Sequence, residues 1–244
     1  MKPLLHEQSR RFVWAGAIFL LLLFRITLGQ EAEHNSAEAF DKIARTTLKN
    51  VYPYLALQIK QDYGITRGLC VEAGAGGAYL SIELAKITEL KFQALDIDPA
   101  AIRIAQRNIR NAGLTQRIEA VLGDVQKMPF PDHSADLVIS RGSFLFWKDK
   151  VKAFGEIWRI LKPGGVAFIG GGVGKLLPPD EKEIIKEKMT KGEFGPPKNL
   201  WIDLEDMSKI LREAGISQFE VTSDDACICG MWVEFKKPVA SVKK

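Results

Sequence analysis

Cysteine is scarce in this sequence, which has three cysteines among 244 residues. Cys70 lies in a short apolar run, where we expect a small buried side chain. Cys227 and Cys229 are two residues apart, too close for an unstrained disulfide with each other. They could hold a soft metal, but without a second cluster we favour their interpretation as strand residues and predict no metal site. The count excludes a disulfide framework and leaves the redox compartment open.

A long stripe of positive charge is also missing. The net charge is +4, and the lysines near the C-terminus do not extend into a basic run. Binding of nucleic acid normally requires a concentrated basic patch, so we predict no nucleic-acid partner. Internal repeats and low-complexity tracts are absent from the sequence too. The hydrophobic fraction of 46% and the charged fraction of 26% indicate one ordinary globular domain, with room for an appendage.

Residues 12–24 form an uncharged apolar run bounded by arginines. The run is short for a membrane span of about 20 residues and close in length to a signal-peptide core. Small residues at 27–29 offer a weak cleavage site; alternatively the run continues as an uncleaved anchor, with Arg25 snorkelling. The paired arginines before it loosely resemble a twin-arginine export signal. We therefore separate a signal-like or membrane-anchor segment at 1–30 from a domain at 31–244; a buried helix and a misassigned start codon are the alternatives.

From residue 68 onward, short β-rich runs alternate with helical patterns. Strands are predicted at 69–72, 92–97, 117–122, 136–140, 166–169, 216–222 and 228–235. Helices are predicted at 36–63 (broken near Tyr52-Pro53), from Leu80 to Ala85, and at 99–112, 151–161, 179–190 and 203–214. Such alternation gives a parallel sheet with helices on both faces, and the last two strands are close enough in sequence to pair antiparallel. The predicted fold is α/β: a Rossmann-like, doubly wound, mostly parallel seven-stranded sheet with an antiparallel closing strand.

Two acidic strand ends frame a glycine-rich turn. The first predicted strand ends at Glu72 and leads into Gly74 and Gly76, and the second ends at Asp96, one βα unit later. In a parallel sheet these ends meet at the same edge, so a backbone cradle lies beside a carboxylate that can bind hydroxyls. This arrangement predicts a site for a nucleoside cofactor.

The turn lacks the features of two common nucleotide sites. A dinucleotide fingerprint needs a third glycine, but Tyr79 stands in its place, and a P-loop needs a Gly-Lys-Ser/Thr ending that is absent. The spacing fits an acidic-x-Gly-x-Gly loop instead. A carboxylate such as Glu72 attracts a cationic ligand and repels a pyrophosphate. We therefore predict S-adenosyl-L-methionine, which carries a sulfonium and a free ammonium, in preference to NAD.

Five segments occur in an order that is typical of one enzyme family. They are 71–76 (Val-Glu-Ala-Gly-Ala-Gly), 94–99 (Ala-Leu-Asp-Ile-Asp-Pro), 123–130 (Gly-Asp-Val-Gln-Lys-Met-Pro-Phe), 135–140 (Ala-Asp-Leu-Val-Ile-Ser) and 161–165 (Leu-Lys-Pro-Gly-Gly). Together they resemble the class I S-adenosylmethionine-dependent methyltransferases, particularly the small-molecule group that includes ubiquinone and menaquinone methylases. The resemblance covers about residues 52–174 and implies one class I methyltransferase domain at 31–244. One departure is Ala78, where the family often carries a third glycine.

The resemblance implies a set of cofactor-binding residues. Glu72, Gly74 and Gly76 are expected to line the methionine portion of the cofactor. Asp96 is expected to take the ribose hydroxyls, with Ile97 packing on the adenine. The presence of Asp96 at this position is hard to explain by a purely structural role.

Two later segments extend the implied cofactor site. Asp124 is expected to accept a hydrogen bond from the adenine amino group, with Val125 beside it, although a turn or helix-cap role is open for Asp124. Ser140 and Arg141 end the fourth strand, where the backbone of the family usually meets the amino-acid end of the cofactor. The side chain of Arg141 either steers an acidic substrate or pairs with Asp149.

The expected methyl acceptor is a small molecule. Methyl transfer needs in-line alignment more than a dedicated base, so the sequence leaves the catalytic residues unassigned. An Asn/Asp-Pro-Pro-aromatic motif is absent after the fourth strand, which disfavours a nucleic-acid or protein substrate. Candidate substrate walls are Tyr52, Tyr54, Phe144, Phe146 and Trp147, although such aromatics more often pack in a core.

The sequence also predicts two functional loops and a location at a membrane. The glycine run 170–174 is predicted to be a mobile loop, and 193–197 a lid. Positive charge before the apolar run predicts that the N-terminus stays in the cytosol and that the domain lies on the opposite side of the membrane. The cofactor, however, is made in the cytosol. We expect a membrane-associated or exported protein, with a cytosolic-facing domain favoured by cofactor supply and membrane association through residues 12–24. A cofactor-binding protein without catalysis and an NAD-dependent reductase are the alternative functions.

Overall fold

The computed structural model describes residues 37–224, 226–227 and 230–239. The apolar run 12–24 lies outside the described residues, so its membrane or signal role stays a prediction. Among the residues that are described, no helix has the length and apolar character needed to cross a bilayer.

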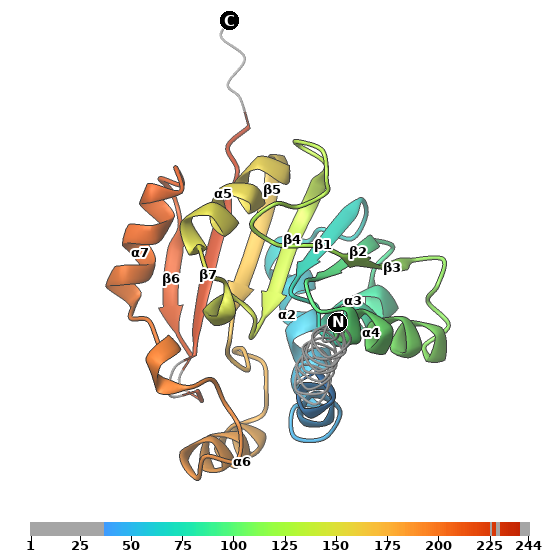
Figure 1. Cartoon of the computed structure of the whole chain (residues 1–244), viewed down its shortest axis with the longest axis vertical. Coiled ribbons are helices and arrows are strands. Elements are labelled where there is room, and N and C mark those ends of the chain that lie inside the picture. The colour runs from blue at the N-terminus through green and yellow to red at the C-terminus, as the bar shows by residue number, and fades with distance from the viewer. Residues whose placement is uncertain (1–36, 225, 228–229, 240–244) are drawn as a thin grey trace, which may run out of the picture.

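A single seven-stranded sheet organises the domain (Figure 1). Its strands are β1 (Leu69–Ala73), β2 (Lys91–Asp96), β3 (Ile118–Leu122), β4 (Ala135–Arg141), β5 (Leu161–Gly170), β6 (Glu220–Ser223) and β7 (Met231–Lys236). Their spatial order is β3-β2-β1-β4-β5-β7-β6, and β7 runs antiparallel to both of its neighbours while the other pairs are parallel. The predicted seven-stranded, mostly parallel fold is confirmed. Because the strand order reverses between β1 and β4, the carboxyl ends of these strands form a crevice suited to a ligand.

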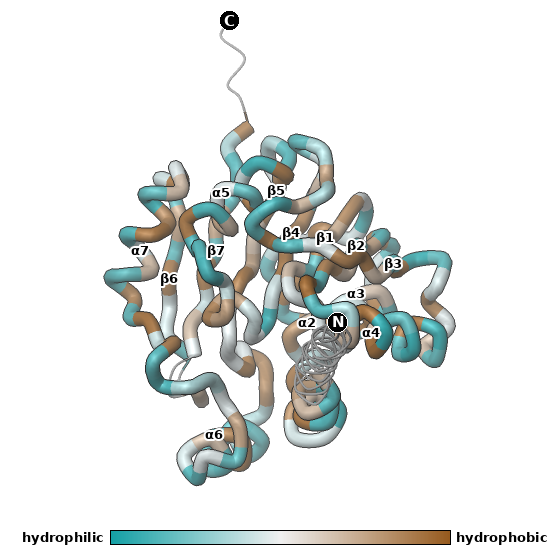
Figure 2. Tube along the Cα trace, in the orientation of Figure 1, coloured by the Kyte–Doolittle hydropathy of each residue, from teal (hydrophilic) through white to brown (hydrophobic). Residues whose placement is uncertain are grey.

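Helices cover both faces of this sheet. They are α2 (Val51–Tyr63), α3 (Tyr79–Ile87), α4 (Pro99–Asn111), α5 (Lys150–Ile160), α6 (Pro179–Thr190) and α7 (Leu204–Glu213), with short 3-10 turns η1 (Phe144–Phe146) and η2 (Lys198–Leu200). Residues of α2, α3 and α4 pack with Cys70 on one face, and residues of α5 and α7 pack with Val71 on the other. Side chains alternate between the faces of a strand, so β1 contributes to both cores. Figure 2 shows hydrophobic residues running through the central strands.

The first predicted helix breaks earlier than expected. Residues 37–45 are helical and 46–50 form turns, so that α2 begins at Val51. Pro53 therefore lies in the first turn of α2, where its missing N–H has no intrahelical partner to lose. The sequence prediction placed the break near the proline, because it did not include the turn at 46–50, after which a new helix begins.

The starts of the fifth and sixth strands differ most from the prediction. The fifth strand was expected at 166–169, yet β5 includes the preceding Lys-Pro-Gly-Gly segment. The register shifts there, since Ala135 pairs with Leu161 but Leu137 pairs with Val166, and such an irregularity accommodates a proline in a strand. The sixth strand was expected from residue 216 but begins at Glu220.

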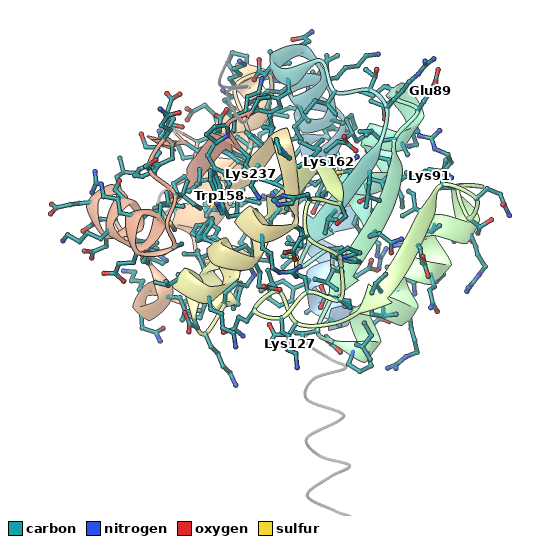
Figure 3. All side chains as sticks on the ribbon, turned by 90° about the horizontal axis from the view of Figure 1, so that it is seen from above. Glu89, Lys91, Lys127, Trp158, Lys162 and Lys237 are labelled. Carbon is teal, nitrogen blue, oxygen red and sulfur yellow. The ribbon has the colours of Figure 1, made fainter. Side chains whose placement is uncertain are left out.

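A buried lysine follows β7 at the end of the sheet opposite this crevice. Lys237 is 9% exposed, and its Nζ donates to the carbonyl oxygens of Trp158 at 2.5 Å and of Arg159 at 3.4 Å (Figure 3). Burial lowers the pKa of Lys237. These contacts join the end of β7 to α5 and have a structural role.

Candidate functional site

A cavity of about 480 Å³ lies at the carboxyl ends of β1, β2 and β4. Of the residues predicted from sequence, it is lined by Tyr52, Glu72, Gly74, Gly76, Asp96, Ile97, Asp124, Val125, Arg141, Phe146 and Trp147. Its volume is typical of a site for a small molecule or cofactor. The two acidic strand ends therefore meet at one pocket, as their topology requires.

The glycine turn after β1 is shaped by two glycines with different tasks. Both have positive φ angles, +69° at Gly74 and +51° at Gly76, a conformation that favours glycine. A Cβ on Gly74 would lie 2.3 Å from the Cβ of Ser143, whereas a Cβ on Gly76 would meet nothing within 4 Å. Gly74 thus permits close packing, and Gly76 keeps the backbone bare where it borders the cavity.

Ala78, which stands where the family often carries a third glycine, adopts a left-handed backbone conformation. Its φ is +59°, its side chain is fully buried, and its N–H donates to the Ala75 carbonyl at 2.8 Å. A left-handed conformation costs an L-residue roughly 1–2 kcal/mol. Alanine is therefore accommodated at this position at a modest conformational cost.

Glu72 is a buried acid at the floor of the cavity. One oxygen accepts hydrogen bonds from the Ser81 N–H at 3.1 Å and the Ser81 hydroxyl at 2.5 Å. Burial raises the pKa of the Glu72 carboxyl to about 7, because desolvation outweighs the two hydrogen bonds from Ser81. A cation bound nearby would restore the charged form of this side chain.

Asp96 links the end of β2 to the glycine turn. Its oxygens accept from the Gly76 N–H at 2.8 Å and from the Asp98 N–H at 3.0 Å. Burial raises the pKa of Asp96, and these backbone donors oppose the rise. A carboxylate has about four acceptor positions, so each oxygen retains capacity for a hydroxyl donor.

The residues expected around an adenine also border the cavity. Ile97 is 66% exposed, unusual for a large apolar side chain, and Val125 is buried in the wall. Asp124 accepts from the backbone N–H of Gln126 at 2.8 Å, so the turn role left open by the sequence is present. Its place in the lining keeps it available to a ligand as well.

Ser140 does not line the cavity, unlike its neighbour Arg141. The Ser140 hydroxyl lies 2.7 Å from that of Ser143, which donates to the Ala73 carbonyl at 2.8 Å. Ser143 borders the cavity in its place. Sequence reasoning missed Ser143, and the neighbouring Gly142 was the available indication that the chain turns back here.

Two of the proposed substrate-wall aromatics lie elsewhere. Phe144 is 1% exposed and packs with the core that includes α5, and Tyr54 packs at the edge of the other core. The assignment of Phe144 and Tyr54 to the cavity wall is therefore corrected. In the 3-10 turn η1, consecutive side chains point in different directions, which places Phe144 in the core and leaves Phe146 45% exposed at the cavity.

The helical segment at 37–45 contributes residues that no motif indicated. Phe40 lies edge-on to Phe146, with ring centroids 5.9 Å apart. Asp41 accepts from the Tyr79 hydroxyl at 2.8 Å and from Arg107 at 3.0 Å, which holds the segment against α3 and α4. These contacts join positions far apart in the sequence, so a local pattern does not report them.

The glycine run after β5 is tied down by Asp224, contrary to the predicted mobile loop. One oxygen of this buried carboxylate accepts from the N–H groups of Val173 and Gly174 and from Trp232 Nε1, each at 2.9 Å. A Cβ on Gly172 would lie 2.1 Å from the same oxygen. The glycines here allow close approach, which the sequence alone did not distinguish from flexibility.

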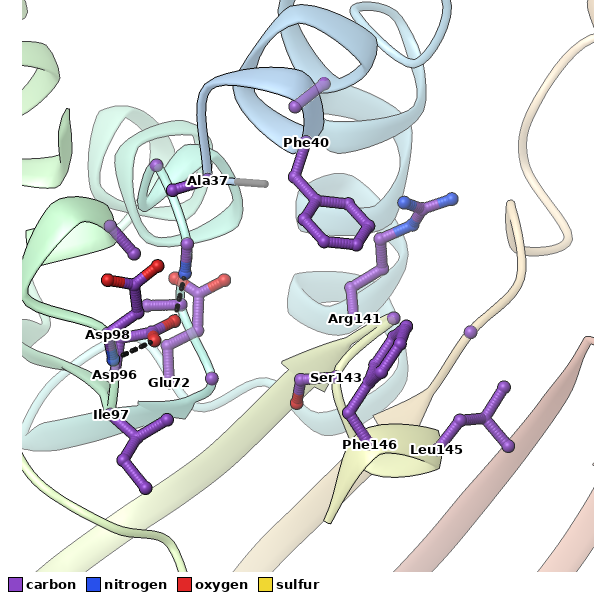
Figure 4. Close-up of a pocket in the computed structure, with 18 of the residues that line it drawn as sticks. Ala37, Phe40, Glu72, Asp96, Ile97, Asp98, Arg141, Ser143, Leu145 and Phe146 are labelled. Atoms are coloured by element: carbon purple, nitrogen blue, oxygen red, sulfur yellow. Dashed lines mark hydrogen bonds between the residues drawn. The ribbon is translucent and has the colours of Figure 1, made fainter. Parts of the chain in front are cut away.

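The cavity has two chemically different sides (Figure 4). We call the side with Glu72, Asp96, Ile97 and Asp98 the acidic half. We call the side with Phe40, Tyr52, Arg141, Leu145 and Phe146 the aromatic half. Within the described part of the chain, no cluster of three or more His, Cys, Asp or Glu side chains is arranged to hold a metal ion.

Known proteins are similar to this chain in sequence and in fold. A methyltransferase-domain family model matches residues 71–169. A solved structure from Methanococcus maripaludis, assigned as an S-adenosyl-L-methionine-dependent methyltransferase, is 38% identical, with a TM-score of 0.73 over 86% of this chain and 95% of its own. The chain belongs to the S-adenosylmethionine-dependent methyltransferases. The chain is also 27% identical over 191 residues to the erythromycin 3''-O-methyltransferase of Saccharopolyspora erythraea, and that match covers 74% of the chain.

The match to curated relatives is partial in length. The chain spans 61% of the erythromycin enzyme and 65% of an uncharacterized methyltransferase of Bacillus subtilis, to which it is 32% identical over 51% of its own length. S-adenosylmethionine is the cofactor of the family. The acidic half has the groups that this cofactor needs: a carboxylate for its positive charges, a glycine backbone without side chains, and an apolar side chain for its base.

Proposed function

We propose that this chain catalyses methyl transfer from S-adenosylmethionine to a small-molecule acceptor by in-line displacement. The observation that carries the proposal is one cavity lined by both halves, so that a cationic nucleoside and a second molecule can meet inside it (Figure 4). The relatives named above support the same reaction class. The alternatives are cofactor binding without catalysis and NAD-dependent reduction.

Three residues of the acidic half have a definite task in this proposal. Glu72 would hold the positively charged end of the cofactor, and Asp96 would accept the ribose hydroxyls with the acceptor capacity that Gly76 and Asp98 leave. Ile97 would cover one face of the adenine ring. When bound, S-adenosylmethionine supplies a methyl group on a sulfonium, and the acceptor's lone pair takes it while the sulfur keeps the bonding electrons.

The protein's contribution to the rate is alignment and exclusion of water. Alignment of two bound reactants can supply roughly 7–11 kcal/mol of the barrier when the reacting atoms approach in line. The tethered loop after β5 and the contact between Tyr52 and Tyr79, with ring centroids 5.3 Å apart, hold the walls around that space. No side chain is assigned as a general base.

Equilibrium dialysis of the full-length chain against S-adenosylmethionine and NADH tests the cofactor. We expect preferential binding of S-adenosylmethionine, weakened roughly tenfold or more in Asp96→Ala because a buried charged hydrogen bond is lost. Glu89→Gln, on an exposed side chain outside the cavity, is the matched control and should bind as the unmodified chain does. Preferential NADH binding that Asp96→Ala leaves unchanged would overturn the proposal.

Catalysis needs a separate measurement. We expect formation of S-adenosylhomocysteine to depend on an added small-molecule acceptor, and to fall with Asp96→Ala in parallel with cofactor affinity. Tight cofactor binding with no turnover across amine, hydroxyl, carboxylate and carbon acceptors would favour a binding protein instead.

The location of the chain is a further part of the proposal. Residues 12–24 would associate it with a membrane, with the catalytic domain on the cytosolic side where the cofactor is made. The resemblance to ubiquinone and menaquinone methylases supports an apolar acceptor, which suits such a location. Membrane fractionation with protease protection tests this: a domain that sediments with membranes and is digested from the cytosolic side is expected, and a soluble or externally digested domain would contradict it.

A further inference from the structure

Arg141 brings a positive charge to the aromatic half of the cavity. Its Nε donates to the Gly172 carbonyl at 3.2 Å, and its Cζ lies 5.7 Å from the centre of the Tyr52 ring. Burial raises the pKa of Tyr52, which keeps this phenol neutral. In the described part of the chain, the arginines that form ion pairs are Arg45, Arg67, Arg107 and Arg159. The charge of Arg141 thus lacks a carboxylate counterion among the described residues.

The acidic residues around the cavity are engaged elsewhere. Asp149, the partner that the sequence offered for Arg141, accepts from the Lys152 N–H at 2.9 Å and caps α5. Asp41 is already paired with Arg107 and Tyr79. Glu72 and Asp96 lie across the cavity from the guanidinium (Figure 4). The pairing alternative is therefore not what the structure shows, and the recognition alternative is left.

The surroundings of this charge are apolar. Phe40 is 54% exposed and Phe146 is 45% exposed, and their rings meet edge-on beside the cavity. Leu145 lines the same side (Figure 4). Aromatic surface that is wet in the free protein gains free energy when a flat apolar molecule covers it.

We propose that the aromatic half binds a methyl acceptor with a flat apolar body and an anionic group, and that Arg141 binds the anion. This proposal rests on the methyl-transfer function above and adds the acceptor class. The planar guanidinium matches a carboxylate or a phosphate through paired N–H donors, and the low-dielectric wall strengthens that contact. A cationic amine would be repelled from the same position, so charge sets the specificity.

Matched aromatic probes test the acceptor class on the full-length chain saturated with S-adenosylhomocysteine. The probes are 2-naphthoate, 2-naphthyl phosphate, the neutral 2-naphthamide and the cationic 2-naphthylmethylammonium. We expect the anions to bind roughly tenfold or more tightly than the amide, the range of one charged hydrogen-bonded contact, and the cation to bind weakest. Whichever of the two anions binds more tightly indicates whether the acceptor carries a carboxylate or a phosphate.

Variants of Arg141 assign the preference to this side chain. Arg141→Gln should abolish the preference for anions while cofactor affinity stays within about twofold, and Arg141→Lys should restore part of it because the charge returns without the planar fork. Arg103→Gln, an exposed arginine on α4 that does not line the cavity, is the control and should keep the full preference. Thermal melting verifies that each variant is folded.

Anion preference and cofactor binding can be lost separately, and each loss has its own meaning. If the unmodified chain binds cofactor but treats anion and amide alike, the acceptor class is wrong and methyl transfer stands. If Arg141→Gln weakens cofactor binding tenfold with no change in anion preference, the guanidinium serves the cofactor's own carboxylate and the inference is overturned. If the unmodified chain does not bind S-adenosylmethionine, the proposed function itself fails.

Discussion

The carboxylate of Asp96 accepts a hydrogen bond from the backbone N–H of Gly76 at 2.8 Å. The contact joins the end of β2 to the turn after β1, two features that the sequence presents twenty positions apart. It orients an acidic side chain and a bare stretch of backbone toward the same space. Under the proposed function, the free protein holds much of its cofactor-binding geometry before the ligand arrives, which lowers the ordering cost of binding.

Glu72→Gln should remove a pH dependence of stability. Because the folded-state pKa of Glu72 is raised to about 7 from 4.5, the folded form holds the proton more tightly than the unfolded chain does. Its contribution is fully present below pH 4.5 and is lost as the pH rises through 7. In chemical denaturation without cofactor, the free energy of unfolding of the unmodified chain should fall, relative to that of Glu72→Gln, by on the order of 3 kcal/mol between pH 4.5 and 8.

Glu213→Gln, at the exposed end of α7, controls for the loss of an acidic residue. It should follow the pH profile of the unmodified chain. A difference between Glu72→Gln and the unmodified chain that is the same at both pH values would show that Glu72 is not the titrating group.

Ile97→Ala should weaken cofactor binding with little effect on folding. The side chain is 66% exposed, so its removal should change the free energy of unfolding by less than about 0.5 kcal/mol. Loss of an apolar contact with the adenine should cost roughly 1–2 kcal/mol of binding, which titration calorimetry measures. Leu122→Ala, with 57% exposure and no place in the cavity lining, should change neither quantity. Equal effects of the two variants on cofactor affinity would show that Ile97 does not contact the adenine.

Gly172→Ala should destabilise the fold. The new Cβ would lie 2.1 Å from an oxygen of Asp224, which is buried and also holds Val173 and Trp232. Relief of this clash must move a bonded carboxylate, so a loss of about 1–3 kcal/mol is expected in chemical denaturation. A variant as stable as the unmodified chain would mean that the loop yields freely, as a mobile segment would.

Gly155→Ala is the opposite case and should stabilise the protein. Gly155 lies inside α5, and a Cβ there would meet nothing within 4 Å. Alanine in a helix interior is favoured over glycine by about 1 kcal/mol, because glycine loses more backbone entropy on folding. A rise of a few degrees in Tm is expected, with cofactor affinity unchanged. A lower Tm would indicate that α5 needs an unhindered backbone at this position.

Particular residues show how far local patterns extend. Gly74, Gly76 and Asp96 were predictable because turn chemistry and strand-end position are encoded within a few residues. Phe144 and Phe146 were not separable in the sequence, because both are apolar and the direction of each side chain depends on a short 3-10 turn. Ser143 and Phe40 lacked any motif, since their roles arise from contacts with segments far away in the chain.

The sequence by itself determined the strand and helix alternation, and hence the sheet, together with the acidic glycine turn that suits a sulfonium cofactor. Those properties depend on local periodicity and on residue chemistry at fixed spacing. Only the tertiary structure decided which aromatics border the cavity, that Asp224 ties the loop after β5, and that Arg141 stands without a carboxylate partner among the described residues. The physical reason is that packing, hydrogen bonding and charge neutralisation join residues 50 or more positions apart, and such pairings exist only once the chain has folded.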